Sequence, residues 1–255
     1  MTTIVLNTLI LPLSALLATP VSATSVIGMN FTQFWTNPQV SDGTADGFSS
    51  WTDSELAAGG PFRNTGTNVS LNGSADVRMT WNAANIWDAG EESNNEQALY
   101  RQYLDDGDGG GSLVDGDGIG VSVTITGLSA WLTSEGMISY EIRAYASSDA
   151  DGATFRPVSV RGGISLGGTV LTTIVIPVLG DNEFPTGGFD QNWDPRGFGD
   201  SINTLTADSI TLTIPTGNGS DIRGSLAAVK ITAIPEPSTV LLGGFGILGL
   251  LHRRR

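Results

Sequence analysis

The chain has 255 residues, a formal net charge of −14, 34 glycines, one histidine and no cysteine. The absence of cysteine excludes disulfides and thiol catalysis, and because the single histidine is His252, near the C-terminus, the body has no Ser–His–Asp arrangement and no imidazole metal ligand. The sequence has only 12 Lys and Arg against 26 Asp and Glu. This balance disfavours nucleic acid as a partner, because binding phosphates requires clustered basic residues.

The first segment has the features of a secretory signal peptide. Ile4–Ala18 is an apolar run of the required length, and Val21 and Ala23 are small residues at the −3 and −1 positions of a cleavage site. The sequence therefore predicts a signal helix in residues 1–23, cleaved between Ala23 and Thr24. Residues 1–23 contain no Lys or Arg, which departs from the usual pattern, and a buried strand or an uncleaved anchor is the alternative.

Residues 24–232 are dominated by alternation of apolar and polar side chains with a period of two. Strands are predicted at Ser25–Phe31, Ala75–Trp81, Ile119–Leu128, Met137–Ala146, Arg156–Gly162, Thr169–Val178, Asp208–Pro215 and Leu226–Thr232. Short strands separated by Gly, Asn and Asp turns predict one all-β domain, an antiparallel β-sandwich of jelly-roll-like form. Trp81 alternates in phase with Val77 and Met79 and is predicted to face the interior.

One short helix is expected within Glu91–Asp106. Leu99, Tyr100, Tyr103 and Leu104 would form a single apolar face on a helix. Acidic residues precede this face, where the positive end of a helix dipole favours them. The helix is expected to cap one end of the sandwich.

The stretch "LDDGDGGGSLVDGDGIG" is the first candidate binding site. It carries Asp105, Asp106, Asp108, Asp115 and Asp117. Calcium takes six to eight oxygen ligands on a sharply turning backbone, and glycines permit such turns. The stretch is not an EF-hand, because a third acidic position and the final Glu are missing. A calcium site and a solvated acidic loop are both open interpretations.

The stretch "FPTGGFDQNWDPRGFGD" is the second candidate. Trp193 offers a flat apolar face, and Asp190, Asn192 and Arg196 could bond to sugar hydroxyls, a combination suited to glycan binding. The alternative is a tryptophan folded over the edge of the sandwich. The remaining tryptophans are predicted to pack in the core or at its edge: Trp51, Trp81, Trp87 and Trp131.

The C-terminal segment has three parts in a fixed order. Pro235-Glu236-Pro237 precedes an apolar run, Val240–Leu251, which is followed by Arg253, Arg254 and Arg255. The apolar run has 12 residues, or 14 with Ser238 and Thr239. In a helix, 14 residues span about 21 Å, which is short of a hydrocarbon core of about 30 Å. The sequence therefore predicts a short transmembrane helix that retains the chain temporarily, with the arginines on the cytoplasmic side and the body outside.

This order and spacing resemble the PEP-CTERM sorting signal over residues 233–255. The resemblance implies export by the Sec machinery, a transient inner-membrane intermediate, and cleavage near Pro-Glu-Pro by an exosortase. It also implies delivery to the surface or extracellular matrix of a Gram-negative bacterium that makes exopolysaccharide. Three body segments, "LYRQYLDDG", "GVSVTITGL" and "YEIRAYASSD", resemble more loosely the galactose-binding-like sandwich ectodomains of PEP-CTERM proteins, a resemblance that assigns no catalytic residue.

Three functions follow from these observations. The first is a non-enzymatic surface or matrix protein with a structural or adhesive role in exopolysaccharide or biofilm. The second is a carbohydrate-binding module, with or without calcium, which is the one cofactor considered. The third is a small glycan-active hydrolase using two carboxylates, for which Glu135, Glu141 and Glu183 are candidates but no spacing selects a pair.

Overall fold

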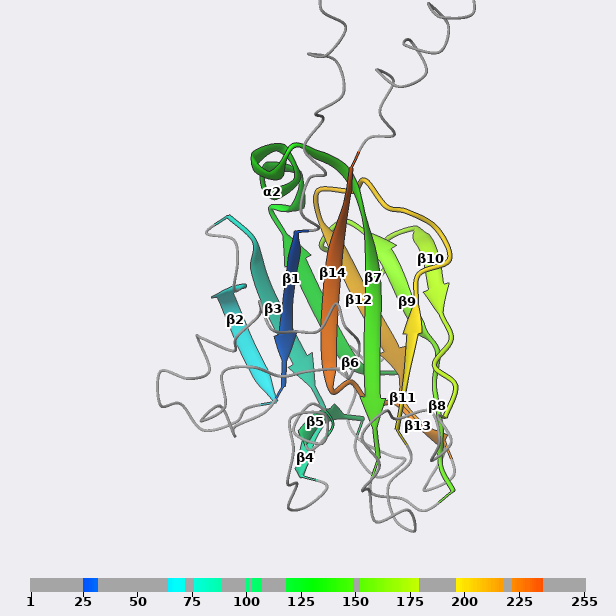
Figure 1. The fold of residues 1–255 in the computed structure, drawn as a ribbon. Coiled ribbons are helices and arrows are strands. Elements are labelled where there is room, and N and C mark those ends of the chain that lie inside the picture. Colours follow the sequence, from blue (N-terminus) through cyan, green and yellow to red (C-terminus); the bar gives the residue numbers. More distant parts are fainter. Residues whose placement is uncertain are drawn as a thin grey trace, which may run out of the picture.

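The computed structural model describes residues 25–31, 64–71, 76–88, 100, 102–106, 118–148, 152–178, 196–217 and 222–235. These residues form strands and the short helix α2 (Leu128–Glu135), arranged as in Figure 1, and Tyr100 is also helical. The strands are β1 (Val26–Asn30), β2 (Thr65–Ser70), β3 (Arg78–Ala83), β4 (Asn85–Asp88), β5 (Gln102–Asp105), β6 (Ile119–Thr126), β7 (Met137–Ser147), β8 (Thr154–Phe155), β9 (Val158–Gly162), β10 (Val170–Ile174), β11 (Arg196–Asp200), β12 (Ile210–Pro215), β13 (Ile222–Arg223) and β14 (Ala228–Pro235).

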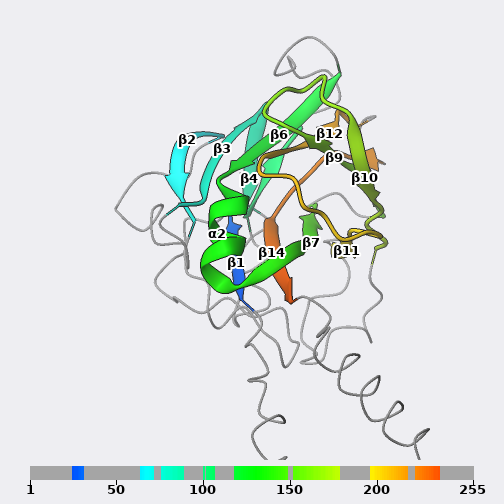
Figure 2. The same cartoon turned by 90° about the horizontal axis from the view of Figure 1, so that it is seen from above.

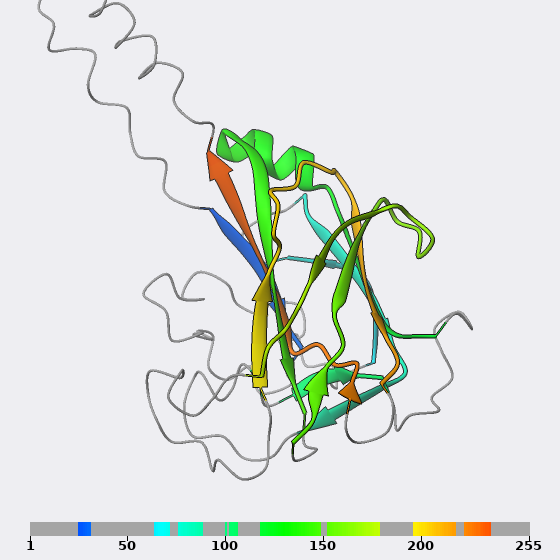
Figure 3. The same cartoon turned by 90° about the vertical axis from the view of Figure 1, so that its right-hand side faces the viewer.

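Two antiparallel sheets face each other, as the edge-on view in Figure 3 shows. One has four strands in the order β1-β14-β7-β11, and the other has six in the order β10-β9-β12-β6-β3-β2. Two short pairs, antiparallel β4–β5 and parallel β8–β13, accompany them. The prediction of an all-β, antiparallel sandwich is confirmed for the described residues.

The predicted signal helix in residues 1–23 and the predicted C-terminal membrane helix lie outside the described residues. Within the part of the chain that the structure describes, no helix has the length and apolar character needed to cross a membrane.

The core lies between the two sheets and follows the predicted alternation. Val123 in β6 and Met79 in β3 are fully buried, and Trp81 is confirmed as an interior residue. Phe31, just after β1, meets Trp81 edge-on with ring centroids 5.5 Å apart, so this aromatic pair joins the two layers. Alternation works here because successive side chains of a strand point to opposite faces.

Thr211 and Thr213, whose side chains alternate with the core residues of β12, are buried as well. The hydroxyl groups of Thr124 and Thr211 lie 3.2 Å apart, and Thr211 also donates a hydrogen bond to the carbonyl of Gly163 at 2.8 Å. On the next strand pair, Arg161 Nε donates to the Thr213 hydroxyl at 3.2 Å. These bonds satisfy polar groups that burial would otherwise leave unpaired.

Strand β11 closes one side of the sandwich, where its backbone lies very close to the backbone of the residues that follow β10. A Cβ atom on Gly197 would meet the carbonyl oxygen of Pro177, and one on Gly199 would meet that of Val175. Only glycine lets the four-stranded sheet approach the chain that follows β10 this closely.

The helix predicted within Glu91–Asp106 is confirmed at Tyr100, which is helical, and is wrong over Gln102–Asp105, which is strand β5 paired with β4. Residues 91–99 and 101 lie outside the described residues. Tyr103 and Leu104 are adjacent and both fully buried. A short strand buried on both faces has consecutive apolar residues, and this pattern resembles one face of a helix.

A helix that was not predicted, α2, lies between β6 and β7, where it covers one end of the sandwich (Figures 1 and 2). Leu128, Trp131 and Leu132 have helical spacing and are buried against the core, which confirms packing for Trp131. Gly136 ends the helix in the left-handed conformation, with φ of 68°, and its N–H bonds back into the last turn.

Two further apolar residues depart from the prediction. Alternation along β7 predicts that Ile138 faces inward with Tyr140 and Ile142, but Ile138, the second residue of the strand, is 45% exposed. Trp87 is also 45% exposed, on the two-stranded β4–β5 pair and outside the main core.

Candidate functional site

Both ends of the described body meet at one end of the four-stranded sheet. β1 is an edge strand whose partner is β14, with Val26 opposite Thr232. The N–H of Ala233 donates to the carbonyl of Ser25 at 2.9 Å. Ser25 is the second residue after the predicted signal-cleavage bond. The start of β1 and the end of β14 both lie at the end of the sandwich that carries α2 (Figures 1 and 3).

β14 continues into the Pro-Glu-Pro segment. The predicted last strand ended at Thr232, but β14 extends to Pro235, which lies opposite Met137 of β7 after an irregularity in register. Proline has no N–H to donate to a neighbouring strand, so it suits a strand end. Glu236, Pro237 and Arg253–Arg255 lie outside the described residues.

β14 is also a structural strand of the body. It pairs with β1 on one side and β7 on the other, and Val229 and Ile231 are fully buried in the core. Ala233, the residue nearest the Pro-Glu-Pro segment on this face, is 1% exposed. The core therefore extends to within two residues of Pro235.

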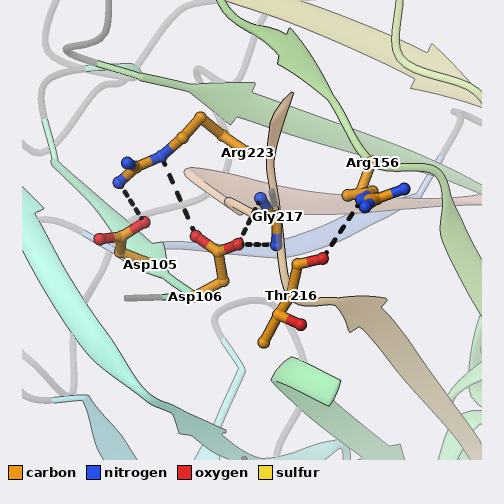
Figure 4. Close-up of polar contacts among 7 residues, drawn as sticks. Asp105, Asp106, Arg156, Thr216, Gly217 and Arg223 are labelled. Atoms are coloured by element: carbon orange, nitrogen blue, oxygen red, sulfur yellow. Dashed lines mark hydrogen bonds and ion pairs between the residues drawn. The ribbon is translucent and has the colours of Figure 1, made fainter. Parts of the chain in front are cut away.

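At the opposite end of the sandwich, the structure brings together Asp105 and Asp106, the first two predicted calcium ligands. Arg223 Nη2 in β13 donates a hydrogen bond to Asp105 Oδ1 at 2.8 Å, and its Nε lies 3.9 Å from Asp106 Oδ1 (Figure 4). Asp106 Oδ2 accepts the backbone N–H groups of Gly217 and Gly224, the latter at 3.0 Å. Both aspartates are 1% exposed.

Three glycines surround Asp106. A Cβ on Gly120 would meet the Asp106 side chain, one on Gly217 would meet the carbonyl of Ile222, and one on Gly224 would meet that of Pro215. Nearby, Arg156 Nε donates to the carbonyl of Thr216 at 3.2 Å (Figure 4). These contacts join the end of β5 to the chain on both sides of residues 218–221.

The electrostatics of the cluster centre on Asp105. Burial raises its pKa from 3.8 to about 6, and the neighbouring Asp106 adds to the rise, while the positive charge of Arg223 opposes it. Two carboxylates and one guanidinium thus share a space that solvent hardly reaches.

The remaining predicted calcium ligands, Asp108, Asp115 and Asp117, lie outside the described residues. Asp105 and Asp106 direct oxygens to a guanidinium and to backbone amides. Among the residues that the structure describes, no group of three His, Cys, Asp or Glu side chains could hold a metal ion. A calcium site in this stretch stays a prediction. In the structure, Asp105 and Asp106 bind Arg223 and backbone N–H groups.

Of the predicted glycan-binding residues, only Arg196 is described; Asp190, Asn192 and Trp193 lie outside the described residues. Arg196 opens β11, is buried, and places its guanidinium 6.0 Å from the centroid of the Tyr100 ring. Of the candidate carboxylates for hydrolysis, Glu135 and Glu141 are exposed on different elements and Glu183 is not described.

Sequence reasoning missed the partners of these residues. Nothing in the sequence around Arg223 or Gly224 indicates that they meet Asp105 and Asp106. It also missed the pair between Arg143 and Asp200, in which Nε lies 2.6 Å from Oδ1 and Nη2 donates to Oδ2 at 2.9 Å. Such contacts join strands far apart in the chain, so no local spacing indicates them.

Comparison with known proteins bears on the C-terminal segment. A family model for the PEP-CTERM protein-sorting motif matches residues 233–255. No curated protein and no solved structure matches the chain. The motif implies export, cell-surface sorting in Gram-negative bacteria and an exosortase as processing partner. The chain therefore carries, where β14 leaves the sandwich, the PEP-CTERM protein-sorting motif of an exosortase substrate.

Proposed function

We propose that the protein is a non-enzymatic β-sandwich delivered to the cell surface or extracellular matrix, where it has a structural or adhesive role in exopolysaccharide or biofilm. The observation that carries this proposal is the dual use of β14, which completes the core and also begins the sorting motif. Removal of the segment beyond β14 would leave every described strand in place, so the released product would be an intact domain.

The buried aspartate pair supports a structural role for this part of the body. General acid and base groups must come within hydrogen-bond reach of the substrate. Asp105 and Asp106 are sealed from solvent, and their oxygens contact Arg223, Gly217 and Gly224. These contacts connect the end of β5 to β13 and to the residues after β12, and so they stabilise this end of the sandwich.

The test compares the host bacterium with and without its exosortase. We expect the protein in the medium or surface fraction of the first, lacking Arg253–Arg255, and a full-length, membrane-bound protein in the second. Deleting the gene for this protein should reduce biofilm mass, and re-expression should restore it only when residues 233–255 are present. Identical location and C-terminal mass in both strains would refute sorting by exosortase.

Carbohydrate binding is the second candidate, favoured by the exposure of Trp87. This indole lies on β4, whose partner β5 leads directly into the acidic stretch after Asp106. An exposed indole provides a flat apolar face for a sugar ring. Glycan-array binding with and without EDTA tests it: binding that Trp87→Ala abolishes supports this function, and no binding in either condition rules it out.

A further inference from the structure

We infer that the outer edge of β10 is a self-association site, at which β10 of a second copy of this chain pairs in antiparallel orientation and extends the six-stranded sheet. This inference rests on the proposed structural or adhesive function and specifies its partner, which is another copy of the same sandwich. β10 lies on the side of the molecule that faces the viewer in Figure 3.

The first step concerns the backbone edge of β10. This strand is the terminal one of the six-stranded sheet, and β9 is its one partner among the strands that the structure describes. Beyond Ile174 the chain lies against the other sheet, because the backbone after β10 closely approaches the glycines of β11. The edge that remains open is therefore Val170–Ile174, and its N–H and C=O groups form a template for another strand.

The second step concerns exposed apolar side chains beside this edge. Eight large apolar side chains are exposed in the described part of the chain, and five of them lie within residues 164–178: Ile164, Val170, Leu171, Val175 and Val178. Val175 is 69% exposed, whereas the neighbouring Ile174 and Ile176 are buried. Single exposed apolar residues are ordinary, but such a concentration along one edge marks an interaction surface.

β10 is less protected than the other sheet edges. β11 has a charged residue at each end, Arg196 and Asp200. β2 is interrupted at Asn68, whose φ of 56° accompanies a shift in register with β3, and four of the five residues of β1 are buried. Charges, irregular backbone and burial keep an edge from pairing with another chain, whereas β10 has one irregularity, between Val170 and Thr172, and no charged residue.

Charge and composition identify the partner as a second copy. The chain has a net charge of −14, so two copies repel each other in general, but no charged side chain stands between Arg161 and Asp181. Along β10 two copies therefore meet without like charges in the paired segment. Residues 169–176, TVLTTIVI, are all β-branched except Leu171, and uncharged segments of high β-propensity pair with copies of themselves.

The alternation in β10 gives this pairing a defined geometry. Leu171, Thr173 and Val175 are exposed, whereas Thr172 and Ile174 are buried. An antiparallel pair of identical strands has two-fold symmetry, so each contact forms twice. In the register that sets Thr173 opposite Thr173, Leu171 of each copy lies opposite Val175 of the other, and these exposed apolar residues pack together.

The first experiment is cysteine cross-linking, which the natural absence of cysteine makes specific. A Thr173→Cys variant of the full-length chain, oxidised in detergent, should form a disulfide-linked dimer, because the two thiols face each other at the symmetry axis. Thr67→Cys is the matched control, since Thr67 is also an exposed threonine but lies on β2, at the opposite edge of the same sheet. Equal yields of dimer from the two variants would overturn the inference.

The second experiment measures association of the same protein by sedimentation. Thr173→Lys should weaken dimerisation by about fivefold, because it sets two like charges opposite each other, whereas Thr67→Lys should leave it unchanged. Mixing Thr173→Lys with Thr173→Glu should restore dimerisation, since opposite charges then meet. Thr173 is exposed, so each variant should fold. A monomeric parent, or dimerisation that Thr173→Lys leaves unchanged, would overturn the inference.

These outcomes are separable from those that test the proposed function. If dimers form at β10 but deletion of the gene leaves biofilm mass unchanged, the structural or adhesive role is refuted and the self-association site is supported. If deletion reduces biofilm mass but the protein is monomeric, the inference is overturned and the role stands. Cross-linking of Thr173→Cys in intact cells only to a different protein would assign this edge to another partner and would also overturn the inference.

Discussion

Arg223 donates a hydrogen bond to Asp105 at 2.8 Å although 118 positions separate the two residues in the chain. The bond connects β13 to the end of β5 and is almost wholly removed from solvent. Asp106 adds bonds to Gly217 and Gly224, so one buried cluster holds the end of β5 and both sides of residues 218–221. The stability of this end of the sandwich depends on a few polar residues.

Replacing Arg223 by methionine should lower the free energy of unfolding by about 3–5 kcal/mol at pH 7, because two buried carboxyl groups lose their positive partner. Urea unfolding of purified protein measures this change. Arg143→Met is the matched control: its partner Asp200 is half exposed, so losing that ion pair should cost about 1 kcal/mol or less. Equal losses in the two variants would contradict a special role for the buried cluster.

Stability should fall as the pH rises from about 4 to about 6. The pKa of Asp105 is 3.8 in the unfolded chain and about 6 in the folded protein, so the folded state binds more protons in this window. The contribution is full below pH 3.8 and lost as the pH passes 6, and the shift corresponds to at most about 3 kcal/mol. Urea titrations at pH 4, 5, 6 and 7 test this.

Asp105→Asn is the control for the pH dependence. The amide has the shape of the protonated carboxyl and does not titrate, so the decline between pH 4 and pH 6 should flatten while stability at pH 4 stays near that of the parent. An unchanged decline in this variant would show that another group causes it.

Gly224→Ala should destabilise the protein by about 1–3 kcal/mol, since the added Cβ would meet the carbonyl of Pro215 and lie 3.0 Å from Asp106 Oδ2. Gly167→Ala is the control, because its Cβ would find its nearest atom, Ser165 Oγ, at 3.8 Å. That change should stay within about 0.5 kcal/mol. Melting temperatures of both variants give the comparison, and similar losses would argue against close packing around Asp106.

Trp131→Ala should cost about 3–5 kcal/mol, because the indole is fully buried between α2 and the core. Trp87→Ala should cost less than about 1 kcal/mol, since nearly half of that side chain is exposed. Chemical unfolding of both variants checks the difference. A large loss for Trp87→Ala would mean that its ring serves packing and would weaken the case for glycan binding.

The sequence predicted most of the sandwich and little of the candidate sites. Eight predicted strands overlap β1, β3, β6, β7, β9, β10, β12 and β14. β11 was missed because its Arg-Gly-Phe-Gly-Asp sequence has little apolar alternation and lies in the sheet through close backbone contacts. α2 was missed although a signal was present, namely Leu128, Trp131 and Leu132 at helical spacing followed by Gly136.

Local sequence patterns determined some features of this protein, and contacts between distant segments determined the others. The sequence by itself determined the period-two strands and the motif in residues 233–255, because side-chain alternation and the order Pro-Glu-Pro, apolar run and arginines are local properties. Only the tertiary structure decided that Asp105 and Asp106 face Arg223 and that β1 and β14 adjoin. These contacts join segments that are far apart in the chain, and they form only when the core brings the strands together. No local pattern in the sequence therefore indicates which residues will meet.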